Sequence, residues 1–167
     1  MKSPSAHNEL RHSIMENPVD ILALQEPYVF RNRIPFSLSA RAFHSHPLND
    51  IIYSAIVVIN NSLIVDQLSD FTNSFATTLL IQTKHRYLVL VNIYIHSNSF
   101  GVIHQNFFTS LLSTYSNLPI ILCGDFNARN PYWHDVVTNR NGYMFKEVID
   151  NHNLIVINNK SKTCRNA

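Results

Sequence analysis

The chain has 167 residues, of which 46% are apolar and 11% aromatic, so it can form one globular domain with a hydrophobic core but hardly two. Charged residues make up only 14%, yet the apolar content excludes disorder as the main state. The net charge of +2 is too small to indicate a nucleic-acid or membrane partner. We therefore expect a single domain over residues 1–167.

Asparagine is unusually common in this sequence and glycine unusually rare. The chain has 20 Asn and only 3 Gly. Asparagine tolerates left-handed backbone conformations and bonds to its own backbone in turns. We therefore expect asparagine to occupy many of the turns.

The sequence shows no sign of export or membrane insertion. The opening MKSPSAHNELRHSIMENP has no apolar segment typical of a signal peptide. No apolar run approaches the roughly 18 residues that a membrane span needs. Two cysteines, Cys123 and Cys164, are too few for a disulfide framework. These features predict an intracellular protein with reduced thiols and no membrane partner.

The first elements are a short helix and an apolar strand. Leu10 and Ile14 lie on one face of residues 6–16, which predicts an amphipathic helix. Residues 19–27 form an almost unbroken apolar run, typical of a strand buried on both faces. Residues 28–50 are polar and aperiodic, which predicts a long connection.

The middle of the chain is rich in β-forming residues. Three apolar runs cover residues 51–59, 74–82 and 86–95, with a shorter run at 63–68. They are too closely spaced for intervening helices, so antiparallel pairing is expected.

The last part alternates helices and strands. Within residues 100–115, a helical core face is formed by Ile103, Phe107, Leu111 and Tyr115. A buried strand is predicted at 118–127, then a second helix whose apolar face holds Met144, Phe145, Val148 and Ile149, and a final strand at 154–158. This order predicts an α/β fold with sheets packed on each other and helices outside.

Two of the predicted strands end in acidic residues. Gln25 and Glu26 follow the first strand, and Gly124, Asp125 and Asn127 follow the strand before the second helix. Functional sites gather at the carboxyl ends of strands in α/β sheets. Two carboxylates converging there would suit Mg²⁺, which prefers oxygen ligands. The alternative is that both carboxylates belong to solvated turns.

Three segments together resemble one superfamily. DILALQEP, VNIYIHS and IILCGDFNARNPYW are similar to motifs of the endonuclease/exonuclease/phosphatase superfamily. The continuation NPYWHDVVTNRNGYMFKEVIDNHNLIVINN resembles the endonuclease domain of jockey-type non-LTR (LINE) retrotransposons. The resemblance covers nearly the whole chain and implies a DNase I-like sandwich of two mixed β-sheets with helices outside.

The resemblance also implies roles for particular residues. Glu26 matches the metal-binding glutamate, Asp125 the aspartate that orients or deprotonates the attacking water, and Asn127 the neighbouring asparagine that contacts the phosphate. Tyr94 matches a tyrosine near the scissile phosphate. The implied activity is Mg²⁺-dependent hydrolysis of a phosphodiester, with Mn²⁺ as an alternative metal. In such retrotransposons the enzyme nicks target DNA to prime reverse transcription, in the nucleus, with the reverse transcriptase as a domain of the same polyprotein.

Weaker candidates lie after the last motif. Arg129, Arg140 and Asn141 are candidates for contacting DNA phosphates, although solvated loop residues have the same composition. Tyr132 and Trp133 could stack on a base, but we favour packing within the domain.

The resemblance also exposes differences from complete superfamily members. The chain starts beyond their first strand, and it has no Ser-Asp-His segment near its end. We therefore expect a partial domain with little or no turnover by itself. Two alternatives stay open: a superfamily phosphatase acting on inositol phosphates or lipids, and a non-catalytic remnant.

Overall fold

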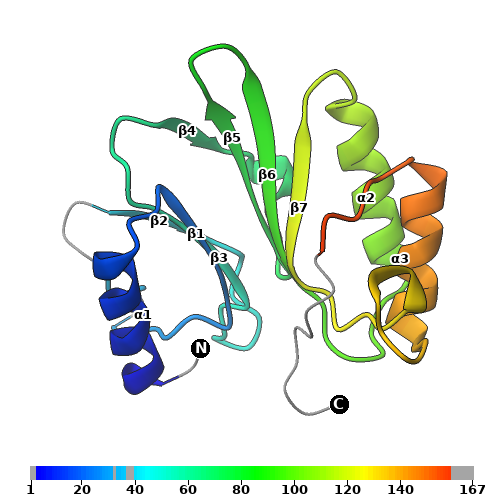
Figure 1. The fold of residues 1–167 in the computed structure, drawn as a ribbon, viewed down its shortest axis with the longest axis horizontal. Helices are drawn as coiled ribbons and strands as arrows, with labels where there is room; N and C mark the ends of the chain where they lie inside the picture. The colour runs from blue at the N-terminus through cyan, green and yellow to red at the C-terminus, as the bar shows by residue number, and fades with distance from the viewer. Residues whose placement is uncertain (1–2, 32, 37–39, 159–167) are drawn as a thin grey trace. The chain divides into compact units, whose positions relative to one another are not determined.

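The computed structural model describes residues 3–31, 33–36 and 40–158, and the prediction for Cys164 lies outside them. The chain forms two compact units, whose helices and strands are labelled in Figure 1. The first contains Met1–Tyr94 and Tyr115–Asp125, and the second contains Ile95–Thr114 and the chain from Phe126 onward. Each unit is described by itself.

The first unit begins with a helix and a three-stranded sheet. Its elements are α1 (Pro4–Glu16), β1 (Ile21–Gln25), β2 (Arg41–His44) and β3 (Ser54–Val58). The strand order is β1-β3-β2, and both pairs are antiparallel. The Ser3 side chain caps α1 by accepting a hydrogen bond from the Ala6 backbone N–H at 3.2 Å.

A four-stranded sheet completes the first unit. Its strands are β4 (Ile64–Gln67), β5 (Ala76–Gln82), β6 (Tyr87–Tyr94) and β7 (Ile120–Asp125), in that order, with the 3-10 turn η1 (Ser69–Phe71) after β4. The closely spaced strands β4, β5 and β6 pair antiparallel, as predicted. β7 pairs parallel with β6, because helix α2 (Val102–Thr114) connects them as a crossover.

The two sheets bury a common core. It combines inward-facing residues of β3, β4 and β5, namely Ile56, Val58, Val65, Leu79 and Ile81. On the other face of β3, Ala55 and Val57 pack with Leu24, and Leu10 of α1 packs against them. This alternation follows from the two-residue period of a strand, and it confirms the predicted sandwich of packed sheets with a helix outside.

The second unit is built around aromatic rings. Its elements are α2, the 3-10 turn η2 (Pro131–Trp133) and α3 (Arg140–Asn151). Phe108 and Phe145 approach to 5.5 Å between ring centroids, and Phe126 stacks on Phe145 at 4.3 Å. Stacked and tilted pairs at such spacings add to the burial energy of the rings. Both predicted helices are confirmed.

Four sequence predictions need correction. The polar segment 28–50 contains strand β2, which the aperiodic composition did not reveal. Residues 154–158 are not a strand: no described strand pairs with them, and Ile155 and Ile157 are 86% and 84% exposed. β1 and β7 lie at sheet edges among the described residues, so they are less buried than predicted. Ile103, in the first turn of α2, is 68% exposed rather than part of the core face.

Asparagine does occupy strained turns, as its abundance predicts. Asn49, Asn98, Asn127 and Asn153 all have positive φ, between 45° and 57°. These are positions where glycine is the usual residue. Asparagine therefore replaces glycine in a chain that has only three.

Two further predictions bear on cysteine chemistry and membranes. Cys123 has no disulfide partner among the described residues, and burial raises the pKa of its thiol to about 11, which keeps it protonated at neutral pH. In the part of the chain that the structure covers, no helix is long and apolar enough to cross a membrane.

Gly124 is required by the close approach of β7 to β6. Its φ is +130°, and a Cβ there would lie 2.0 Å from the Ile93 carbonyl oxygen. We predict that Gly124→Ala lowers the free energy of unfolding by about 3 kcal/mol, measured by urea denaturation. Gly101→Ala is the matched control, because its Cβ would meet nothing closer than 3.9 Å. Equal stability of the two variants would contradict this account.

Candidate active site

Glu26 stands directly after β1 in an uncommon backbone conformation. Its φ is +47°, in the left-handed region that glycine usually occupies. Its backbone N–H donates a hydrogen bond to the Tyr53 carbonyl at 2.8 Å. A non-glycine residue stays in this region only when its surroundings hold it there, and such residues cluster at functional sites.

Tyr94 and Asp125 end two neighbouring strands. In the parallel pairing of β6 with β7, Tyr94 is the register partner of Asp125. The Tyr94 ring stacks on the Tyr53 ring, with centroids 5.1 Å apart and planes at 18°. Because the Glu26 amide is bound to the Tyr53 carbonyl, the same residue supports both Glu26 and Tyr94.

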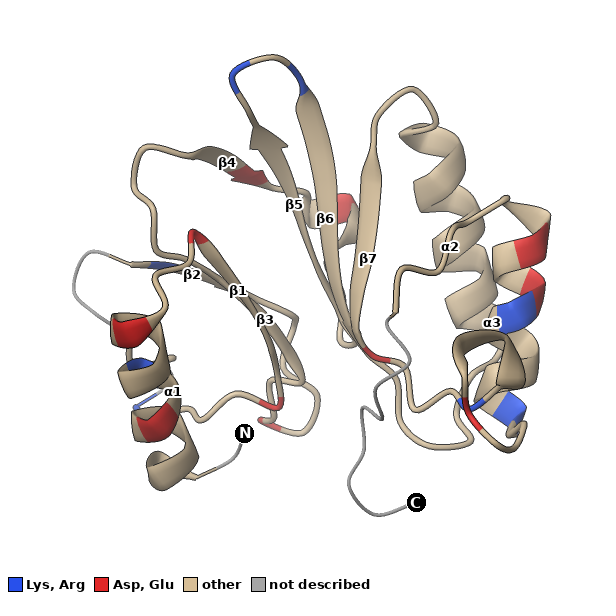
Figure 2. Cartoon of the chain, viewed as in Figure 1, with Lys and Arg blue, Asp and Glu red and all other residues tan. Residues whose placement is uncertain are grey.

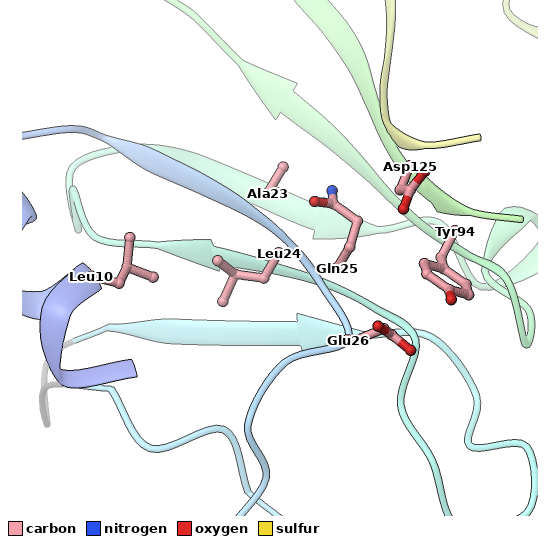
Figure 3. A pocket seen from close by; sticks show the side chains of 7 residues that line it. All are labelled: Leu10, Ala23, Leu24, Gln25, Glu26, Tyr94 and Asp125. Atoms are coloured by element: carbon pink, nitrogen blue, oxygen red, sulfur yellow. The ribbon is translucent and has the colours of Figure 1, made fainter. Parts of the chain in front are cut away.

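Glu26, Tyr94 and Asp125 line one pocket of about 380 Å³ (Figure 3). Gln25 also reaches it, and its remaining walls are apolar: Leu10, Ala23 and Leu24. Figure 2 shows few charges on the sheets, with acidic positions where β1 and β7 end. The structure thus brings together the two carboxylates that the sequence placed at strand ends.

The environment of Tyr94 holds its phenol in the neutral form. Burial, the negative charge of Glu26, a hydrogen bond with Glu26 and the charge of Asp125 raise the pKa of Tyr94 to about 12. At neutral pH the hydroxyl is therefore a hydrogen-bond donor.

The donor set of the pocket suits a hard, hydrated cation. Glu26 and Asp125 offer carboxylate oxygens, and Mg²⁺ is usually held by one or two carboxylates while keeping several waters. Within the described residues, no group of three or more His, Cys, Asp or Glu side chains could enclose a metal. The residues present therefore fit Mg²⁺ or Mn²⁺ better than a fully protein-ligated zinc.

Asn127 belongs to the second unit, two residues after Asp125 in the chain. Its φ is +45°, and its side-chain amide donates to the Ile95 carbonyl at 2.9 Å. Its own carbonyl accepts a hydrogen bond from the Asn139 side chain at 2.8 Å. The Asn127 side chain is thus engaged by hydrogen bonds with residues of its own unit.

The three candidate phosphate contacts differ in their surroundings. Arg140, the first residue of α3, is exposed. Arg129 is paired with Asp135 through two guanidinium nitrogens, with the closest contact at 3.0 Å. Asn141 has no exposed surface. Its amide donates to the His96 and Phe126 carbonyls, and its oxygen accepts from the Phe100 N–H.

Asn141 therefore has a structural role in place of the phosphate contact that the sequence suggested. Its amide joins the segments before and after β7 within the second unit. The neighbouring Gly142 is equally constrained, because a Cβ there would lie 1.8 Å from the Arg129 carbonyl oxygen. The Asn-Gly pair thus shapes the loop that carries Asn127 and Arg129.

Of the two neighbouring aromatic residues Tyr132 and Trp133, Trp133 is packed within the domain and Tyr132 is exposed. The Trp133 indole donates to the Ala128 carbonyl at 3.0 Å and its ring meets Phe145 edge-on, in line with the favoured packing role. Tyr132 is 51% exposed, and the Lys146 ammonium lies 4.5 Å from its ring centroid.

Sequence reasoning assigned no role to two residues that support the pocket. Gln25 Nε2 donates to Asn92 Oδ1 at 2.6 Å, linking β1 to β6. Asn92 in turn donates to the Leu24 and Ala55 carbonyls, at 2.9 and 2.8 Å. A polar amide inside the apolar run of β6 was the available signal, because buried polar groups need partners.

The fold is similar to that of solved endonuclease and endonuclease/exonuclease/phosphatase family structures, as the sequence motifs predicted. Residues 88–167 match the family model described as endonuclease-reverse transcriptase. The endonuclease domain of TRAS1, a telomere-specific non-LTR retrotransposon, superposes with a TM-score of 0.83 at 23% identity, over 94% of this chain and 69% of that domain.

Two more distant structures share the fold. An endonuclease/exonuclease/phosphatase family protein from Leptotrichia buccalis has a TM-score of 0.53 at 12% identity, over 87% of this chain and 66% of its own. The AP endonuclease LMAP from Leishmania major has a TM-score of 0.58 at 14% identity, over 90% and 62%. No curated protein matches the sequence. The chain thus spans between three fifths and seven tenths of these three structures.

The raised pKa of Tyr94 gives a test of the pocket geometry without metal. We expect NMR of ring-labelled tyrosine in EDTA, assigned with Tyr94→Phe, to show this phenol titrating near pH 12 instead of 10.0. The unfolded phenol loses its proton first, so stability should fall between pH 10.0 and about 12.

Variants separate the causes of this shift. Glu26→Gln should lower the pKa of Tyr94 but leave it above 10.0, because burial, the largest cause, remains. The exposed Glu16→Gln is the control and should leave the pKa unchanged. A wild-type Tyr94 pKa close to 10.0 would show that Glu26 and Tyr94 are not held together.

Proposed function

We propose that this chain is part of a Mg²⁺-dependent endonuclease that nicks DNA for a non-LTR retrotransposon. The observation that carries the proposal is the pocket in which Glu26, Tyr94 and Asp125 meet at the ends of three strands. Support comes from the fold shared with a retrotransposon endonuclease domain and from the family match over residues 88–167.

The polar residues of the candidate site have distinct roles in the proposed phosphodiester hydrolysis. Glu26 holds the cation, and Asp125 orients the attacking water and accepts its proton. A bound Mg²⁺ supplies stabilisation of the negative charge that develops on the phosphate. In this proposal Tyr94 and Asn127 contact phosphate oxygens of the bound DNA. Arg129 and the exposed Arg140 contact flanking phosphates by charge.

The product of this reaction fits the proposed biological context. Hydrolysis of one strand leaves a 3′ hydroxyl that a reverse transcriptase can extend. The matching family is described as endonuclease-reverse transcriptase, which supports a reverse-transcriptase domain of the same polyprotein as the partner. Access to chromosomal DNA places this action in the nucleus.

Plasmid nicking tests the proposal. We expect the protein encoded by the complete open reading frame that includes this chain to convert supercoiled plasmid to the nicked form with Mg²⁺, and EDTA to abolish it. Glu26→Gln and Asp125→Asn should each lower the rate by about 100-fold or more, because each removes a group acting on the reacting atoms. Asp66→Asn, an exposed carboxylate on β4, is the control and should nick at the normal rate.

Two results would contradict the proposal. Nicking that survives both site substitutions would place the chemistry elsewhere. Phosphate release from inositol polyphosphates without nicking would favour a superfamily phosphatase.

A further inference from the structure

We propose that Gln25 and Asn92 form a positioning link that fixes Glu26 in the pocket and so sets its affinity for a divalent cation. That the link positions Glu26 rests on the geometry alone. That it sets the affinity for a cation rests on the function proposed above. Neither residue contacts the reacting atoms in this proposal; both act through Glu26.

Asn92 is a fully buried amide whose hydrogen bonds lead to the two strands beneath the pocket. Its side chain is completely inaccessible, and its Nδ2 donates to the carbonyls of Leu24 on β1 and Ala55 on β3. Its backbone carbonyl accepts a bond from Ser54 Oγ at 2.7 Å. One side chain thus ties β6 of the second sheet to both neighbouring strands of the first.

The remaining atom of the Asn92 amide bonds to a residue that lines the pocket. Its Oδ1 accepts the Gln25 Nε2–H at 2.6 Å, a bond that joins residues 67 positions apart. Gln25 immediately precedes Glu26, and Asn92 lies two residues before Tyr94. The link therefore connects residues that lie one position from Glu26 and two positions from Tyr94.

Glu26 needs such support because its local backbone is unfavourable. Its φ of +47° is a conformation that a residue with a side chain adopts only under constraint. Within the described residues β1 is an edge strand, with β3 on one side alone. The Glu26–Tyr53 hydrogen bond comes from that same sheet, whereas Gln25–Asn92 adds a constraint from the other sheet.

Residues that orient a metal-binding side chain commonly control how tightly that side chain binds the metal. Loss of a hydrogen bond behind a metal ligand typically weakens metal affinity 10- to 100-fold. A carboxylate that binds a hydrated Mg²⁺ gains from being held in place before the cation arrives, since a flexible ligand loses entropy on binding.

Gln25→Met tests the link with a side chain of similar length that cannot donate. Gln25 is half-buried, so this change threatens folding less than any change at the fully buried Asn92. Hydrogen exchange of the Glu26 amide is the first measurement, and it needs neither metal nor activity. We expect exchange there to accelerate about tenfold or more, while the Val91 amide in the centre of the sheet stays protected.

Mn²⁺ binding, followed by electron paramagnetic resonance, is the second measurement. We expect Gln25→Met to raise the Kd about tenfold. Val65→Ala is the control for a merely structural effect, since it removes core volume at β4, away from the pocket. It should lower the melting temperature while leaving the Mn²⁺ Kd and the Glu26 exchange rate unchanged.

The outcomes separate the two proposals. Unchanged Glu26 exchange in Gln25→Met overturns the positioning link. Faster exchange with an unchanged Kd overturns its effect on the cation. If the wild-type chain binds no Mn²⁺, the cation half of the inference and the metal role in the proposed function both fall, and the exchange result alone decides whether the link positions Glu26.

Discussion

The buried amide of Asn92 is the contact on which the pocket depends. Two packed sheets are held together mainly by apolar side chains, which are not directional and allow small shifts between the layers. Asn92 adds direction, because its hydrogen bonds to Leu24, Ala55 and Gln25 are formed only in one alignment of the sheets. That alignment brings the end of β1 to the ends of β6 and β7, where Glu26, Tyr94 and Asp125 meet.

The pocket concentrates negative charge in a largely apolar part of the molecule. Like charges in a partly desolvated site repel, and a cation between them relieves the repulsion. The Tyr94 phenol reflects this field, since burial and the nearby carboxylates raise its pKa to about 12. Carboxylates in such a setting suit hydrated divalent cations, which is the metal role proposed above.

The fold and the two carboxylates of the pocket could be predicted from the sequence, for physical reasons. Periodic apolar runs revealed all three α-helices and six strands, and acids after apolar strands pointed to Glu26 and Asp125. Strand β2 was missed because Arg41–His44 has no apolar run. Residues 154–158 were mistaken for a strand because an apolar run becomes a strand only when a neighbouring strand pairs with it. The Gln25–Asn92 bond joins residues 67 apart and leaves no local pattern.

Paramagnetic relaxation by Mn²⁺ tests most directly the central claim that these strand ends form one cation site. Substoichiometric Mn²⁺ would be added to the ¹⁵N-labelled chain, and amide signals compared with those in the presence of EDTA. The account predicts that signals of Glu26, Tyr94 and Asp125 broaden together, while those of the distant edge strand β4, such as Val65, stay sharp. Broadening confined to histidines elsewhere, or none at the three strand ends, would contradict it.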